Sequence, residues 1–122
     1  MKEAGTVKDS EKVVKESVPN AEGIEIQWLI SQEEGSDRIY MRKFTLAPGA
    51  DMKLHSHPHT EHIQYYLKGE VKLIMGSNEY DVSAGDSIYI PPGVKHKYMN
   101  KGTADAEFLC MISGGEIETK IE

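Results

Sequence analysis

Residues 49–69 read GADMKLHSHPHTEHIQYYLKG, a segment that holds four of the five histidines of the chain. His55 and His57 are two residues apart, so in a strand their side chains lie on the same face. Pro58 interrupts that strand, and His62 opens the next run of alternating residues. Two neutral imidazoles side by side are preferred ligands of divalent transition metals. The segment therefore predicts part of a metal site.

The fifth histidine, His96, follows the turn sequence at 91–93 and opens another short strand pattern. It can join the first group only through folding, as ligands from separate strands do. The alternative to a metal site is a surface cluster of solvated histidines. An affinity tag does not fit, because this cluster is internal and spaced.

The rest of the chain has the pattern of short strands. We expect them at 24–30, 40–46, 53–57, 62–67, 70–75, 78–82, 87–90, 95–99 and 106–112. Turns rich in glycine and proline separate them, and Pro48-Gly49 should end the second strand. Such a series is typical of a β-sandwich or barrel. We expect an all-β domain at 23–122, preceded by an N-terminal extension at 1–22 that lies on the surface as a tail or a short strand or helix.

Composition excludes several classes of protein. The 122 residues include 14 Lys and Arg against 20 Asp and Glu, and this net charge of −6 disfavours nucleic acid as a partner. No run approaches the roughly 20 apolar residues of a membrane span, and no apolar stretch of a signal peptide opens the chain. The single Cys110 cannot form an internal disulfide, so we expect a cytoplasmic protein with a buried thiol.

The two histidine segments resemble the paired motifs of the cupin superfamily. The first motif is G-x5-H-x-H-x(3,4)-E-x6-G, and the chain has both of its histidines and both of its glycines. The second motif, G-x5-P-x-G-x2-H-x3-N, is matched in full at 85–100, and fifteen residues separate the motifs. The resemblance covers about 24–112 and implies a small antiparallel jelly-roll β-barrel with a metal inside.

The chain departs from the first motif where the family most often has glutamate. Leaving six residues before Gly69, as the motif does, reaches His62, whereas leaving three residues after His57 reaches Glu61. Distance from the glycine turn determines which way a strand residue points, so His62 is favoured and Glu61 is the alternative. The resemblance then implies one divalent transition metal ion per chain (Mn, Fe, Ni, Cu or Zn), held as in the four-histidine cupins by His55, His57, His62 and His96.

Three further side chains are candidate catalytic residues. Strand alternation puts Gln64 and Tyr66 on the face of His62, and Tyr98 on the face of His96. They are able to hydrogen-bond a substrate or donate a proton. The alternative is that they line the barrel and their polar ends have backbone partners.

The opposite face of the same strand bears on assembly. Tyr65 and Leu67 should point outward, away from His62, and an exposed apolar face needs a partner. Small cupins commonly pair as homodimers through such a face. We therefore expect a homodimer.

A site of four neutral imidazoles leaves the full charge on a divalent ion, which favours an anionic or enolisable substrate. Family analogy implies a metal-dependent dioxygenase or related oxidoreductase that acts on a small enolisable or phenolic molecule. One alternative is a non-oxidative isomerase or lyase of a sugar or keto acid. A phosphosugar would require basic residues in the pocket, and Arg42 is the early candidate. The other alternative is a non-catalytic small-molecule binding protein.

Overall fold

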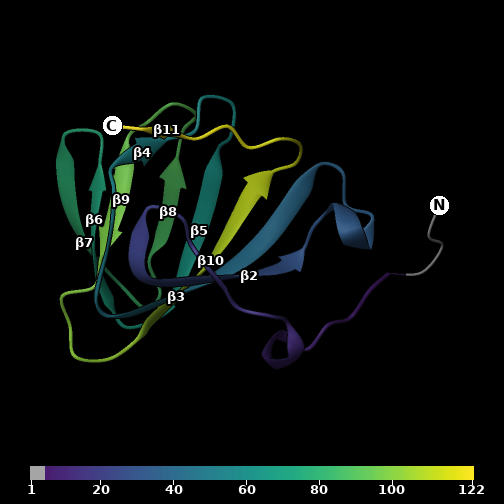
Figure 1. Cartoon of the computed structure of the whole chain (residues 1–122), viewed down its shortest axis with the longest axis horizontal. Coiled ribbons are helices and arrows are strands. Elements are labelled where there is room, and N and C mark those ends of the chain that lie inside the picture. The colour runs from purple at the N-terminus through teal and green to yellow at the C-terminus, as the bar shows by residue number, and fades with distance from the viewer. Residues whose placement is uncertain (1–4) are drawn as a thin grey trace.

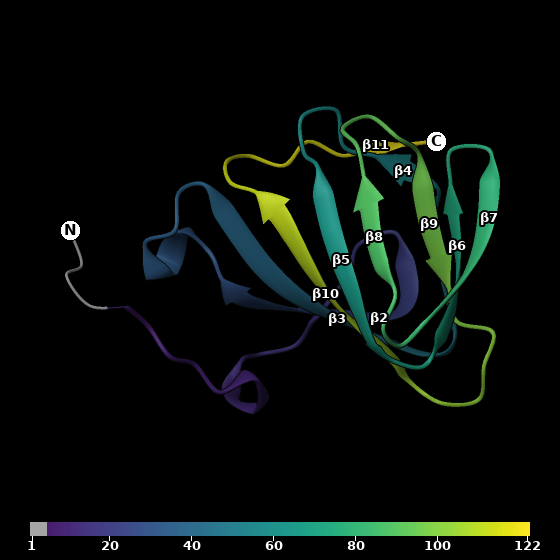
Figure 2. The ribbon, with the colours of Figure 1, turned by 180° about the vertical axis from the view of Figure 1, so that it is seen from behind.

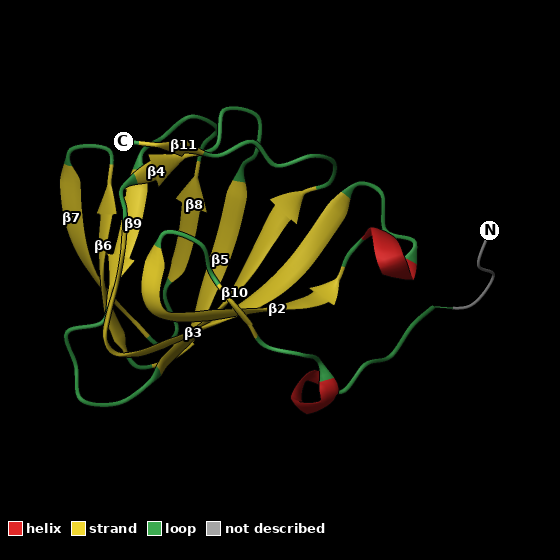
Figure 3. Ribbon diagram, in the orientation of Figure 1, coloured by secondary structure: helices red, strands yellow, loops and turns green. Residues whose placement is uncertain are grey.

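Residues 5–122, which this computed structural model describes, form two antiparallel β-sheets with very little helix (Figure 3). The strands are β1 (Glu16–Ser17), β2 (Ala21–Ile30), β3 (Ile39–Met52), β4 (His55–Ser56), β5 (His62–Lys68), β6 (Glu70–Met75), β7 (Asn78–Ser83), β8 (Ser87–Ile90), β9 (His96–Met99), β10 (Ala106–Ser113) and β11 (Lys120–Ile121). The 3-10 helices η1 (Ser10–Lys12) and η2 (Gln32–Glu34) precede β1 and β3. The predicted all-β jelly roll is confirmed.

The larger sheet has the strand order β1-β2-β3-β10-β5-β8, and the smaller sheet has the order β11-β4-β9-β6-β7 (Figure 1). Side chains on the inner side of each sheet are buried. On β5 the buried residues His62, Gln64 and Tyr66 alternate with exposed ones, as the sequence predicted. Every second residue of β10, from Ala106 onward, is likewise buried.

Strand β3 is longer than predicted, because Pro48-Gly49 bends it without ending it. Gly49 has a φ of 82°, a backbone conformation that glycine adopts without strain. Beyond the bend the Gly49 N–H donates to the Asn100 carbonyl at 2.9 Å, and the Asn100 N–H donates to the Ala50 carbonyl at 3.0 Å. The expected strand at 53–57 is correspondingly reduced to the two residues of β4.

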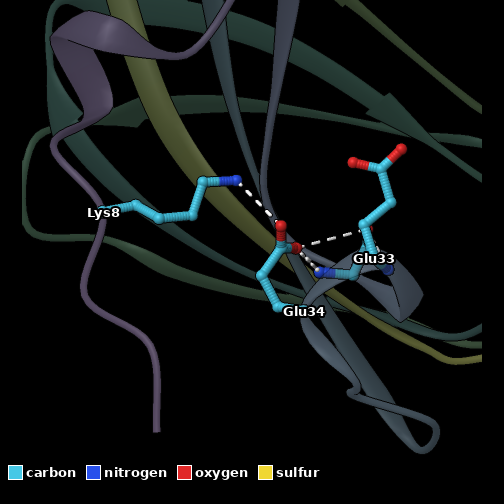
Figure 4. A network of polar contacts seen from close by, with 4 residues as sticks. Lys8, Glu33 and Glu34 are labelled. Carbon is cyan, nitrogen blue, oxygen red and sulfur yellow. Dashed lines mark hydrogen bonds and ion pairs between the residues drawn. The ribbon is translucent and has the colours of Figure 1, made fainter.

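The N-terminal segment is tied to the larger sheet. Lys8 Nζ lies 3.1 Å from Glu34 Oε2, which joins the segment to η2 (Figure 4). Gln27 Nε2 donates to the carbonyl oxygens of Ser10 at 2.6 Å and Val13 at 3.0 Å. The segment lies on the side of the molecule away from β6 and β7 (Figure 2). The predicted domain boundary after residue 22 stays a prediction, and the first four residues of that extension fall outside the described part.

Within residues 5–122, the helices are too short and too polar to cross a membrane.

Candidate metal centre and its pocket

A cavity of about 610 Å³ lies against the inner side of the sheets. Its lining includes residues 16–20 near the start of the described chain and Ile117, Thr119 and Ile121 near its end. Sequence analysis gave neither segment a role in the site. Neither segment carries a motif. The first is brought to the cavity by pairing of β1 with the next strand, β2, and the second by pairing of β11 with the distant strand β4.

Three histidines lie together at this cavity. His55 begins β4 and is the antiparallel partner of His96 at the start of β9, while His57 directly follows β4. Their candidate ligand atoms all lie within 4.8 Å of one another. The two sequence motifs thus meet in space, close enough for His55, His57 and His96 to hold a metal ion.

Hydrogen bonds orient these three rings. His55 and His96 each contact the carbonyl oxygen two residues earlier through Nδ1, at 2.9 Å. His57 Nδ1 contacts the carbonyl oxygen of Glu118 at 3.1 Å. Because a carbonyl oxygen only accepts, each Nδ1 carries the proton and each Nε2 keeps its lone pair. Metal-ligating histidines are commonly oriented in this way, so the donor set fits a divalent transition metal ion.

His62, the predicted fourth ligand, lies beside the group. Its ring centroid is 5.0 Å from that of His57 and 5.4 Å from that of His96. Its side chain points inward, with 3% of its surface exposed, whereas Glu61 faces solvent. Within residues 5–122, the buried Nδ1 of His62 has no hydrogen-bond partner, which is uncommon for a buried nitrogen. His62 as a ligand stays a prediction, while His59 is exposed as expected.

Burial keeps the cluster uncharged. It lowers the pKa of His57 to about 4, that of His96 to about 3 and that of His62 to about 2. The positive charge of Arg42 lowers the pKa of all three further. Neutral imidazole is the form that binds a metal, so the cluster is ready for a cation at neutral pH.

The three candidate catalytic residues occupy different positions. Tyr98 lines the cavity, and Gln64 Nε2 donates to its hydroxyl at 2.6 Å. Gln64 and Tyr66 have no exposed surface and lie behind the cavity wall. In the described part of the chain, Gln64 Oε1 and the Tyr66 hydroxyl lack hydrogen-bond partners. Burial raises the pKa of both tyrosines, so both phenols stay protonated, and the catalytic roles stay predictions.

Arg42, whose direction the sequence left open, lines the cavity. Its strand partners are Trp28 on β2 and Cys110 on β10. The guanidinium carbon lies 5.3 Å from the ring centroid of Trp28 and 5.0 Å from that of Phe44. Nη2 donates to the Cys110 sulfur at 3.1 Å. The thiol is buried as expected, and it also has a polar contact that an apolar side chain would not make.

Comparison with known families agrees with this architecture. A family profile described as a cupin domain matches residues 42–112, more than half of the chain. The chain belongs to the cupin family.

Two curated relatives match part of the chain. An uncharacterized protein of Methanocaldococcus jannaschii is 37% identical over 62 residues, which are 51% of this chain and 50% of that protein. The oxalate decarboxylase OxdC of Bacillus subtilis is 33% identical over 70 residues, which are 53% of this chain and 18% of that protein. The matches span half or less of the length of these relatives.

Solved structures match over most of the chain. The polyketide cyclase RemF of Streptomyces resistomycificus has a TM-score of 0.88 at 24% identity, covering 97% of this chain and 85% of RemF. A predicted oxalate decarboxylase of Thermotoga maritima has a TM-score of 0.81 at 28% identity, covering 90% of this chain and all of that one. These likenesses support the cupin fold.

Proposed function

We propose that this cupin is a metal-dependent dioxygenase acting on a small enolisable or phenolic molecule. The supporting observation is the group of three neutral histidines with ligand atoms within 4.8 Å of one another. One divalent transition metal ion (Mn, Fe, Ni, Cu or Zn) would be held by His55, His57, His62 and His96. Glu61 would have to turn inward from solvent to replace His62.

Side chains of this pocket suit such a substrate. When bound, the ion supplies Lewis acidity and, where it is redox-active, electron transfer involving O2 as the oxidant. The uncharged histidines leave its positive charge available to an enolate or phenolate. Tyr98 keeps its proton and is able to donate a hydrogen bond to an oxygen of the bound molecule. The apolar side chains of Ile26 and Phe44 exclude water from the same cavity.

A second candidate is a non-oxidative isomerase or lyase of a keto acid or sugar. Tyr98 favours it, because a phenol that keeps its proton at the cavity wall is able to donate a hydrogen bond to a carbonyl oxygen of such a substrate. The names of two relatives, a decarboxylase and a cyclase, are consistent with this candidate. If metal-loaded protein shows no turnover, the function is that of a non-catalytic small-molecule binding protein.

The test is metal content followed by oxygen uptake. We expect about one redox-active ion per chain, lost in His96→Ala and retained in His59→Gln, whose parent side chain is exposed. The loaded protein should consume O2 with at least one of 2,4-pentanedione, catechol or a flavonol. Stoichiometric zinc without oxygen uptake would move the proposal to the non-oxidative candidate. A protein that stays empty after metal supplementation would contradict both.

We also propose that two copies pair through the outer face of the larger sheet. Ile63, Tyr65 and Leu67 on β5 are exposed there, as is Tyr89 on β8. Ile63 is the strand partner of Tyr89, so their side chains adjoin on that face.

A further inference from the structure

We propose that Arg42 is an anion subsite, and that the molecule bound in this cavity is a largely apolar carboxylic acid whose carboxylate lies against the Arg42 guanidinium. The subsite depends only on the geometry and charge of the cavity. Placing the enolic or phenolic end of the same molecule at the histidines rests on the proposed function.

The first observation is a buried charge without a counter-charge. Arg42 is 8% exposed, and none of the ion pairs within residues 5–122 includes it. Its Nε is buried with no hydrogen-bond partner, and Nη2 contacts only the Cys110 sulfur, a weak acceptor. Buried charges in proteins are normally paired, because removing them from water is costly. Arg42 therefore has unused donors at the wall of a cavity.

The second observation is how firmly the guanidinium is held. Trp28, Arg42, Cys110 and Gln64 are successive partners across four strands, so they form one row on the inner side of the larger sheet. The guanidinium carbon lies over both aromatic rings, 5.3 Å from the centroid of Trp28 and 5.0 Å from the centroid of Phe44. Cation–π contacts of this kind orient the planar fork before a ligand arrives.

The third observation concerns which anion fits. Among the described residues that line the cavity, Arg42 is the buried permanent cation, whereas Lys53 is exposed. A single guanidinium matches the charge and the two coplanar oxygens of a carboxylate, while a phosphate dianion calls for more donors. A phosphosugar is therefore disfavoured.

The remaining walls indicate the body of the ligand. Ile26, Trp28, Phe44 and Met52 present apolar or aromatic surface to the cavity. Walls of this kind favour an apolar ligand body, which would pack beside Phe44 and not on its ring, because Arg42 and Phe108 already lie against that ring. The histidines line the same cavity, so a second oxygen of that ligand is able to face them.

The experiment uses full-length protein freed of metal with a chelator, at neutral pH, where the histidines are uncharged and no metal competes for the carboxylate. Benzoate and its uncharged isostere benzamide are titrated by calorimetry. Trp28 is the single tryptophan of the chain, so its fluorescence reports binding beside Arg42 directly. We expect benzoate to bind at least about ten-fold tighter than benzamide and acetate.

Two substitutions make the result specific. Arg42→Met keeps a long, flexible side chain without charge and should abolish the preference for benzoate over benzamide. Arg38→Met, at the other arginine, removes the same charge from an exposed site and should preserve the preference. If circular dichroism shows that Arg42→Met is unfolded, Arg42→Lys keeps the charge and should weaken benzoate binding several-fold through loss of the fork.

Four outcomes would overturn the inference: no benzoate binding up to its solubility limit, equal affinity for benzamide, tighter binding of phenyl phosphate, or a preference that survives in folded Arg42→Met. If Arg42→Met does not fold, undiminished benzoate binding by Arg42→Lys takes the place of the last outcome. The metal plays no part in these titrations, so their failure is distinct from failure of the proposed function. A metal-loaded protein that consumes O2 without any Arg42-dependent selectivity would disprove the subsite alone.

Discussion

At position 62 a single residue decides the ligand set. Among the described residues, none is a hydrogen-bond partner of the buried His62 Nδ1, and Glu61 beside it faces solvent. We expect His62→Ala to weaken metal binding by at least about 10–100-fold, the loss seen for supporting groups of metal sites. Competition with a chromophoric chelator measures it. Glu61→Ala is the matched control, and a loss confined to that variant would exchange the two roles.

Buried neutral histidines also make the metal-free protein sensitive to acid. The ordinary pKa is 6.5, and in the folded state burial lowers it to about 2 for His62 and about 3 for His96. Between these values the unfolded chain binds more protons, so the contribution of these histidines to the free energy of unfolding is constant above about pH 6.5 and falls below it. Each histidine contributes up to about 1.4 kcal/mol per pH unit.

Urea unfolding on either side of that pH measures the effect. His96→Gln should flatten the dependence, because it removes one of the buried imidazoles that the unfolded chain would protonate. A dependence that His96→Gln does not reduce would show that other groups cause it.

At the scale of elements, a strand of only two residues, β4, carries His55 of the site. β4 is held by β9 on one side and β11 on the other. The Glu118 carbonyl just before β11 accepts the hydrogen bond of His57. Deleting 118–122 should therefore lower metal affinity while circular dichroism stays that of a folded β protein, because β11 pairs only with β4.

Glu118→Ala is the control for this deletion, since it removes the side chain and keeps the carbonyl oxygen. It should bind metal as the parent does. Equal affinity in the truncated protein would show that His57 needs no support from the C-terminal segment.

The two glycines of the first motif differ in how closely another strand approaches them. Gly69 and Gly49 share a φ of 82°, but a Cβ at Gly69 would lie 2.6 Å from the Ala106 Cα, while at Gly49 nothing lies within 4 Å. Gly49→Ala meets backbone strain alone, about 1–3 kcal/mol. Gly69→Ala adds a clash with the backbone of Ala106 at the start of β10, so it should lower the free energy of unfolding clearly more than Gly49→Ala does. Chemical denaturation ranks the two, and the reverse order would contradict this account.

Sequence analysis predicted local features well and long-range ones poorly. Alternation along β5 correctly separated inward His62 from outward Tyr65, because one sheet face is buried. Alternation could not be followed through Pro48-Gly49, where β3 shifts its register with β2 and two backbone hydrogen bonds join it to Asn100. Arg42 lies on the strand before that bend, and the sequence left open whether its side chain faces the cavity.

The parts of the cavity missed by sequence analysis have the same cause. Residues 16–20 and Thr119 reach it through strand pairing with β2 and β4, and their sequence has no periodicity or motif that marks them. The histidines were found because their chemistry and spacing are rare.

At the scale of the whole molecule, the outer face of the larger sheet is the feature that predicts assembly. Ile63 and Tyr89 are each 51% exposed and Tyr65 is 45% exposed, although all three lie mid-strand. Contiguous apolar surface of this kind usually marks a contact with another chain. We expect light scattering to give twice the chain mass of 13.6 kDa.

Charge placed on that face should separate the copies. Ile63→Lys combined with Tyr89→Lys puts two ammonium groups side by side, and a twofold contact would bring them against the same pair on the second copy. The double variant should therefore elute as a folded monomer. Val7→Lys combined with Val14→Lys, at two exposed residues of the N-terminal segment, is the matched control and should remain a dimer. A monomeric parent would contradict the proposed dimer, and a dimer that only the control variant disrupts would place the contact away from this face.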